Sequence, residues 1–174
     1  IDGLRHWFGE AQSGSGLVRA LRPERTDPAT GAVVQTDAED TFQFSVTFAS
    51  GVVASMTASS AGGPGRGGRT FISGSEGSLF ATQRGGNPEP DGVVLGAQVG
   101  TRTLDELPMP QAYRPFEDER DHRLVAFRLL VREFERGIRE GTSPAPSFED
   151  GWRCQQIMDA IRESSASGRS VAIG

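Results

Sequence analysis

The order of patterns along the chain predicts an α+β domain with a mostly antiparallel, open β-sheet of about six strands. Apolar residues alternate strictly over 41–48 and again over 52–59 after a short turn, which indicates a β-hairpin. A second hairpin is expected at 69–73 and 78–82. Helical patterns close the chain. Strands followed by helices are typical of an antiparallel sheet with its helices packed on one face.

The chain opens in a pattern that reads as the tail of an amphipathic helix. Ile1, Leu4 and the pair Trp7 and Phe8 fall on one stripe, and Gly9 suits the residue after the last turn. No capping residue precedes Ile1, where a helix would not normally begin. We therefore expect the sequence to be a fragment cut inside a helix.

The remaining elements follow from weaker local signals. Further strands are expected at 17–21, 93–95, 102–104 and 170–173, with loops at 26–31, 62–68 and 85–92. A helix from about Asp121 to Gly141 carries one apolar stripe, made of Leu124, Phe127, Val131, Phe134 and Ile138. A last helix should begin at a capping box of Ser147 and Asp150 and end at Gly168.

One face of the first hairpin lacks charge. No charged residue occurs between Thr41 and Gly65, and the side chains expected on this face are Gln43, Ser45, Thr47, Val53, Ser55 and Thr57. A solvated sheet face usually carries charges, so this face favours cover by a second copy of the sheet. An ordinary exposed face rich in Ser and Thr is the alternative.

Composition excludes several classes of protein. The 174 residues suit a single domain, and the net charge of −5 argues against a nucleic-acid partner. All 18 basic residues are arginines, so no lysine can act as a base. The only cysteine, Cys154, excludes an intramolecular disulfide, and no apolar run reaches the length of a membrane span. We expect a cytoplasmic protein.

The stretch Gly63–Gly68 matches the spacing G-x-G-x-x-G, yet its context argues against a dinucleotide site. That motif works by ending a strand and opening a helix whose N-terminal amides hold the pyrophosphate. Here a strand at 69–73 follows the glycines. We interpret the segment as a loop between strands, with no cofactor-binding residue in the chain.

No set of residues forms a self-sufficient catalytic or metal site. His6, His122 and Cys154 lack the paired spacing of metal ligands, and Cys154 is expected to be a small core residue. The acidic pairs 118–119 and 149–150 lie at helix starts, where capping explains them better than proton transfer. We expect no catalytic residue here.

Tyr113 and Arg114 are the candidate substrate-binding residues. They lie between the strands and the long helix, and Tyr113 is the only tyrosine. A phenol beside a fork-shaped donor suits a polyhydroxylated or carboxylated ligand. A tyrosine that packs the loop and a solvated arginine remain the alternative.

Four segments, in order and across most of the chain, resemble the Gfo/Idh/MocA family, which includes glucose–fructose oxidoreductase and inositol dehydrogenase. Residues 1–10 are similar to its H-x-I-D helix, and residues 40–52 resemble its hairpin. Ile72-Ser73-Gly74-Ser75-Glu76-Gly77-Ser78-Leu79 looks like its I-x-G-T-x-G-x-L turn. Residues 148–171 look like its closing helix and strand, which starts with Asp-Gly.

The resemblance implies a two-domain parent. Residues 1–174 would be its C-terminal domain, of the dihydrodipicolinate-reductase-like type, and a Rossmann domain absent from this chain would bind NAD or NADP. This domain would wall the substrate pocket, with Tyr113 and Arg114 as pocket candidates, and form dimers or tetramers through its open sheet face.

The same resemblance implies hydride transfer to or from a sugar, polyol or related compound. The family's catalytic lysine would lie in the Rossmann domain, and its catalytic histidine about two residues before Ile1. Asp2 would have a structural role. The fragment alone would then be inactive. A non-catalytic binding or oligomerisation module is the alternative.

Overall fold

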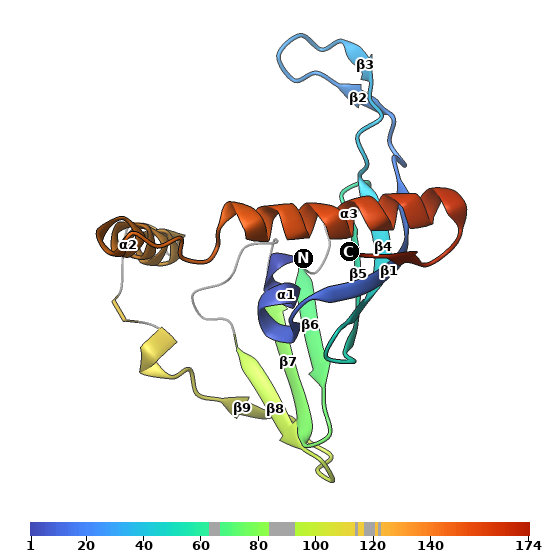
Figure 1. The fold of residues 1–174 in the computed structure, drawn as a ribbon. Helices are drawn as coiled ribbons and strands as arrows, with labels where there is room; N and C mark the ends of the chain where they lie inside the picture. Colours follow the sequence, from blue (N-terminus) through green and yellow to red (C-terminus); the bar gives the residue numbers. More distant parts are fainter. Residues whose placement is uncertain (63–66, 84–92, 114, 117–120, 122) are drawn as a thin grey trace. The chain divides into compact units, whose positions relative to one another are not determined.

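The computed structural model describes residues 1–62, 67–83, 93–113, 115–116, 121 and 123–174. The chain forms two compact units. The first contains residues 1–63 and 145–174, and the second contains residues 64–144. Both chain termini therefore belong to the first unit. The second unit is formed by the residues that lie in sequence between the two segments of the first (Figure 1).

The first unit is built on a four-stranded antiparallel sheet in the order β10-β1-β4-β5. Its strands are β1 (Ala11–Arg19), β4 (Thr41–Phe48), β5 (Val53–Ser59) and β10 (Val171–Ala172). β4 and β5 form the predicted hairpin, in which Phe44 pairs with Met56 and Val46 with Ala54. Gly51, with φ 84°, makes the turn between them, which explains the need for glycine there.

Two helices pack on one face of this sheet, α1 (Asp2–Phe8) and α3 (Phe148–Ser167), and α3 runs across the strands in Figure 1. The core lies between the sheet and these helices. Its buried members are Phe44, Val46, Phe48, Ile157 and Ile161. Alternation in β4 sends its three apolar side chains to one face, and the period of α3 brings both isoleucines onto them. The predicted one-sided packing is confirmed in this unit.

β1 lets α3 approach closely because it carries glycines where α3 crosses it. A Cβ added to Gly16 would lie 2.8 Å from the Gln43 carbonyl oxygen and 2.9 Å from Ile161 Cγ2. Serines of α3 also accept hydrogen bonds from β1, since the Gly16 and Val18 N–H groups donate to Ser164 and Ser165 Oγ at 3.0 Å. The short β10 does not reach these two residues, so the serines satisfy this edge.

A two-stranded ribbon, β2 (Glu24–Thr26) and β3 (Val33–Gln35), extends from the same unit. The predicted turn at 26–31 is its tip. Asp40 anchors its base, because the almost fully buried carboxylate accepts the backbone N–H groups of Leu21 and Arg22 at 2.9 and 2.8 Å. These two hydrogen bonds hold the pKa of the Asp40 carboxyl below its usual range, and the bond from Leu21 has the larger effect.

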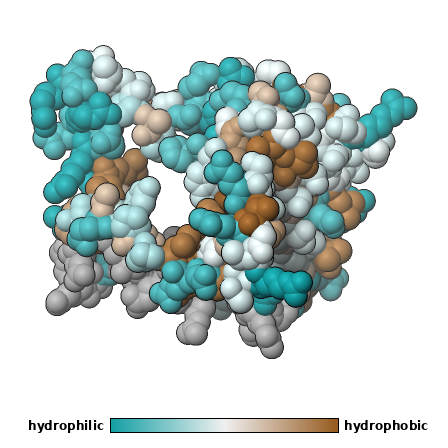
Figure 2. All heavy atoms as spheres, turned by 90° about the horizontal axis from the view of Figure 1, so that it is seen from below, coloured by the Kyte–Doolittle hydropathy of each residue, from teal (hydrophilic) through white to brown (hydrophobic). Residues whose placement is uncertain are grey.

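The second unit contains a four-stranded antiparallel meander, β6-β7-β8-β9, a short 3-10 helix and a long α-helix. Their bounds are β6 (Gly68–Ser73), β7 (Gly77–Gln83), β8 (Val94–Gln98), β9 (Asp105–Leu107), η1 (Gln111–Tyr113) and α2 (Arg123–Glu140). Figure 2 shows hydrophobic residues, in brown, among hydrophilic ones on the face of the molecule in view. The described residues of this unit include no buried large apolar side chain.

The predicted α+β class with antiparallel strands is confirmed, and two details differ. The strands form two four-stranded sheets and a ribbon rather than one sheet of about six strands, because β6 to β9 pair with their sequence neighbours. The strand expected at 102–104 lies at Asp105–Leu107, where pairing with β8 sets its register. The whole loop expected at 85–92, and residues 63–66 of the loop expected at 62–68, lie outside the described residues.

Candidate functional site at the junction of α1 and α3

Arg5 is the centre of the polar cluster that joins α1 to α3. Ile1, Leu4 and Phe8 pack against the core, and Arg5 follows Ile1 by one helical turn, on the same side of α1. Its side chain is only 8 % exposed. An arginine in this position needs acidic partners, because an unpaired buried charge is strongly unfavourable.

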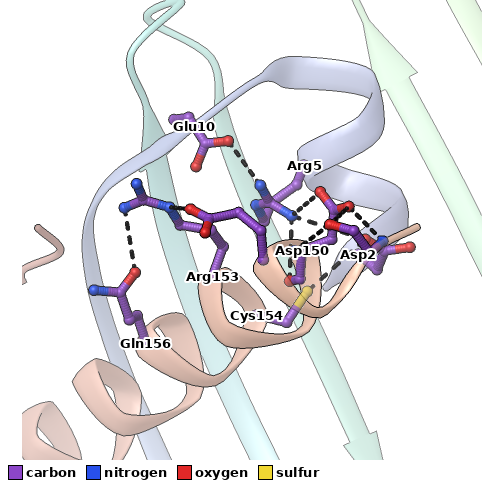
Figure 3. Close-up of polar contacts among 9 residues, drawn as sticks. Asp2, Arg5, Glu10, Asp150, Arg153, Cys154 and Gln156 are labelled. Atoms are coloured by element: carbon purple, nitrogen blue, oxygen red, sulfur yellow. Dashed lines mark hydrogen bonds and ion pairs between the residues drawn. The ribbon is translucent and has the colours of Figure 1, made fainter. Parts of the chain in front are cut away.

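Three carboxylates surround the Arg5 guanidinium (Figure 3). Nη2 donates to Glu10 Oε1 at 2.7 Å, Nη1 donates to Asp150 Oδ1 at 3.3 Å, and Asp2 Oδ1 lies 3.9 Å from Nη1. The hydrogen bond to Glu10, with that to Asp150, raises the pKa of Arg5 above its usual range despite burial. Arg5 is therefore a fixed positive charge that ties α1 to the first turn of α3.

Asp150 has a second role as part of the helix cap. The Ser147 N–H and hydroxyl donate to Asp150 Oδ2 at 2.7 and 2.9 Å, and the Asp150 N–H donates to Ser147 Oγ at 3.3 Å. This is the predicted capping box. The Ser147 N–H, the Ser147 hydroxyl and Arg5 hold the pKa of Asp150 below its usual range. Because it stays ionised at neutral pH, it is poorly suited to carry protons.

A pocket of about 210 Å³ opens beside this cluster. Its lining consists of Asp2, Arg5, His6, Ala145, Pro146 and Asp150. The Asp2 carboxylate is largely exposed and accepts the Cys154 thiol at 3.9 Å. Exposed carboxylate oxygens beside a short apolar wall can accept hydrogen bonds from the hydroxyl groups of a small ligand. His6, also exposed, lines the same pocket.

The structure describes some of the site residues that the sequence predicted, and it corrects one expectation. Tyr113 is the last residue of η1 in the second unit and is 72 % exposed, and its N–H donates to the Pro110 carbonyl at 3.0 Å. Arg114, His122 and the acidic pair 118–119 lie outside the described residues. Cys154 is half-buried beside Asp2, so its expected place in the core is wrong.

Sequence reasoning missed Arg5. The signal was its spacing, since Ile1, Leu4, Arg5 and Phe8 follow the i, i+3, i+4, i+7 pattern of one helix face. A charged residue inside such a stripe predicts a buried ion pair. Its partner Asp150 lies 145 positions further along the chain, so no local pattern could identify it.

Two observations concern cofactor and metal binding by the described residues. Gly67 and Gly68 lead directly into β6, whereas a pyrophosphate site needs a helix N-terminus at that point. No three His, Cys, Asp or Glu side chains of the described residues are grouped so that they could hold a metal ion. In the same part of the chain, no helix combines the length and apolarity of a membrane span.

Comparison with known proteins adds to this geometry. The profile of the oxidoreductase family, C-terminal alpha/beta domain (Gfo/Idh/MocA), matches residues 1–173. A curated relative, an uncharacterised oxidoreductase of Synechocystis sp., is 28 % identical over 170 residues, which are 97 % of this chain and 46 % of the relative.

Two solved structures share the fold. Levoglucosan dehydrogenase in complex with NADH and L-sorbose is 25 % identical, with a TM-score of 0.77 over 100 % of this chain and 48 % of that one. An NAD binding oxidoreductase from Klebsiella pneumoniae is 20 % identical, with a TM-score of 0.76 over 99 % of this chain and 48 % of that one. The chain thus spans about half the length of these relatives, and it belongs to the Gfo/Idh/MocA oxidoreductase family, as its C-terminal α/β domain.

Proposed function

We propose that residues 1–174 are the substrate-binding and assembly domain of an NAD(P)-dependent oxidoreductase whose Rossmann domain lies in another part of the parent protein. The family match over residues 1–173, in a chain that spans about half of its relatives, carries this proposal. The single cysteine agrees with a reducing compartment, and we place the parent in the cytoplasm.

The proposed substrate is a sugar, a polyol or a related hydroxylated compound. The relative bound to NADH and L-sorbose supports this class. The hydrogen-bond acceptors of the pocket beside α1 also suit hydroxyl groups. In this proposal the Arg5 cluster is a positioning device, which fixes the entry of the chain into α1, and Tyr113 and Arg114 contact the substrate.

The decisive experiment uses the full-length protein. Purified parent is mixed with NAD⁺ or NADP⁺ and a panel of sugars and polyols, and reduced nicotinamide is followed by its absorbance. We expect turnover with at least one member of the panel, and none from residues 1–174 alone. Binding of a sugar by the parent without nicotinamide binding would instead favour a non-catalytic module.

Substitution of the two pocket candidates tests their role. Tyr113→Phe and Arg114→Gln should each raise KM about tenfold, since each removes a substrate hydrogen bond and about 1.4 kcal/mol is a factor of ten. Met109→Ala, a change at a nearby exposed residue, is the control and should leave KM unchanged. Unchanged KM in all three variants would remove Tyr113 and Arg114 from the pocket.

We also propose that the uncharged face of the first sheet joins two subunits. Gln43, Ser45 and Thr47 of β4 lie on the face opposite the core, and β5 extends it with small side chains. Thr47→Glu should shift the parent toward monomer in light scattering, because it places a charge in the contact. Thr103→Glu, at an exposed position of the second unit, should not. A monomeric wild type at high micromolar concentration would contradict the proposal.

A further inference from the structure

Helix α2 exposes an apolar stripe along its length. The side chains recur at the spacing of one helix face, and their exposed fractions are high: Phe127 59 %, Leu130 47 %, Val131 47 %, Phe134 66 % and Ile138 70 %. A contiguous row of large apolar side chains on a soluble domain is typical of an interaction surface.

The opposite face of α2 has the character of a solvent face. Arg136 bonds Glu133 at 2.6 Å and Glu140 at 2.9 Å, and Arg139 bonds Glu135 at 2.8 Å. These exposed pairs at i, i+3 and i, i+4 satisfy the charges within the helix itself. The helix is thus amphipathic, with ion pairs on its charged side and large exposed side chains on its apolar side.

The start of α2 is held by cation–π contacts. The guanidinium groups of Arg128 and Arg132 lie 4.1 and 5.0 Å from the Phe116 ring. Phe116 follows the candidate substrate residues Tyr113 and Arg114 closely in sequence. Whatever fixes α2 therefore also restrains the segment that carries them.

We propose that the α2 stripe docks onto the nucleotide-binding half of the parent protein, an inference that rests on the proposed function. The chain spans 46 to 48 % of its relatives, so a parent of their length has about as much chain again to cover this surface. Docking links the substrate wall to the cofactor half, since the docked helix restrains the Tyr113 segment against it.

Two neighbouring leucines provide a matched test. Leu130 lies in the stripe, whereas Leu129, which is 37 % exposed, lies on the side of the ion pairs. Leu130→Glu and Leu129→Glu are the same chemical change at adjacent positions. The measurement is amide hydrogen exchange of α2 by mass spectrometry, in the full-length parent and in residues 1–174.

We expect α2 amides to exchange at least about tenfold more slowly in the parent than in residues 1–174, because docking suppresses local unfolding of the helix. Leu130→Glu should abolish this protection and Leu129→Glu should retain it. In residues 1–174 both variants should keep the wild-type circular dichroism, which shows that the helix still forms.

Three outcomes would overturn the docking proposal. The first is that α2 amides exchange equally fast in the parent and in residues 1–174, and the second is that α2 is protected from exchange in both and that this protection rises with protein concentration. The third is that Leu130→Glu and Leu129→Glu lose the protection of α2 to the same extent. The second would identify a second copy as the occupant. Binding of NADH by the parent, measured separately by fluorescence, reports on the proposed function. A parent that protects α2 without binding NADH would retain the docking surface and refute the oxidoreductase function.

Discussion

The two units of the chain bury apolar side chains to very different extents. In the first, Phe44, Val46 and Phe48 of β4 lie under α3, and all buried apolar side chains of the described residues belong to this unit. In the second, Phe71, Phe134 and other large side chains are exposed. The first unit therefore contains the hydrophobic core of the described residues, whereas the second leaves large apolar side chains exposed.

The largest expected effect separates the two units directly. Phe48→Ala should lower the free energy of unfolding by about 3–5 kcal/mol, because the ring is 1 % exposed and packs on Phe8. Phe71→Ala, at a ring that is 63 % exposed, should cost less than about 1 kcal/mol. Urea unfolding of residues 1–174 measures both. Similar losses would show that the contrast between the units is wrong.

A pair of glycines sharpens the same contrast. Gly16→Ala should cost about 1–3 kcal/mol, since its Cβ would meet the backbone of Gln43 and the buried Ile161. In Gly96→Ala, in β8, the new Cβ would lie 2.7 Å from Leu107 Cδ1 and 3.1 Å from its Cγ. Because this side chain is 42 % exposed and can turn away, a loss below about 1 kcal/mol is expected. The order of the two midpoints in urea is the readout.

The cap of α3 should give the first unit a pH dependence. Ser147→Ala should cost about 1 kcal/mol at neutral pH. The pKa of Asp150 is lower in the folded chain than its ordinary value of 3.8, so its contribution is complete well above that value and is lost as the pH falls through the folded pKa. Thermal unfolding should be measured from pH 7 to pH 2. The difference in unfolding midpoint between the wild type and Asp150→Asn should shrink as the pH falls. A gap of constant size would contradict this origin.

The smallest effect is expected on the charged side of α2. Arg139→Gln removes an exposed ion pair with Glu135 and should change the stability of the helix by about 0.3–0.5 kcal/mol, less at high salt. Circular dichroism at low and high salt measures it. A loss above about 1 kcal/mol would show that this face is a contact surface, which would weaken the contrast between the two sides of α2.

Local signals predicted the elements whose causes are local. The hairpin at 41–59 follows from alternation, and α3 follows from the box of Ser147 and Asp150 at one end and Gly168 at the other. The ribbon was not predicted, because Glu24–Thr26 and Val33–Gln35 are too short to show a period and depend on the anchor at Asp40. The strand Asp105–Leu107 was misplaced because its register comes from β8.

The candidate site shows the same limit. Asp150 was identified in its capping role because Ser147 is its neighbour, but its pairing with Arg5 spans most of the chain. Tyr113 and Arg114 came from their position before a long helix, and their contact with a substrate stays a prediction. The exposure of the α2 stripe was not predicted either, since periodicity reveals an apolar face and not what covers it.

The division of the first unit into two stretches has a consequence for synthesis. β1 and β4 leave the ribosome early, but the helix that covers them, α3, and the edge strand β10 come from the last part of the chain. The nascent protein therefore carries an uncovered β4 throughout translation of residues 64–144. The phenylalanines of β4 that α3 covers in the folded unit therefore stay exposed until residues 148–167 have been synthesised.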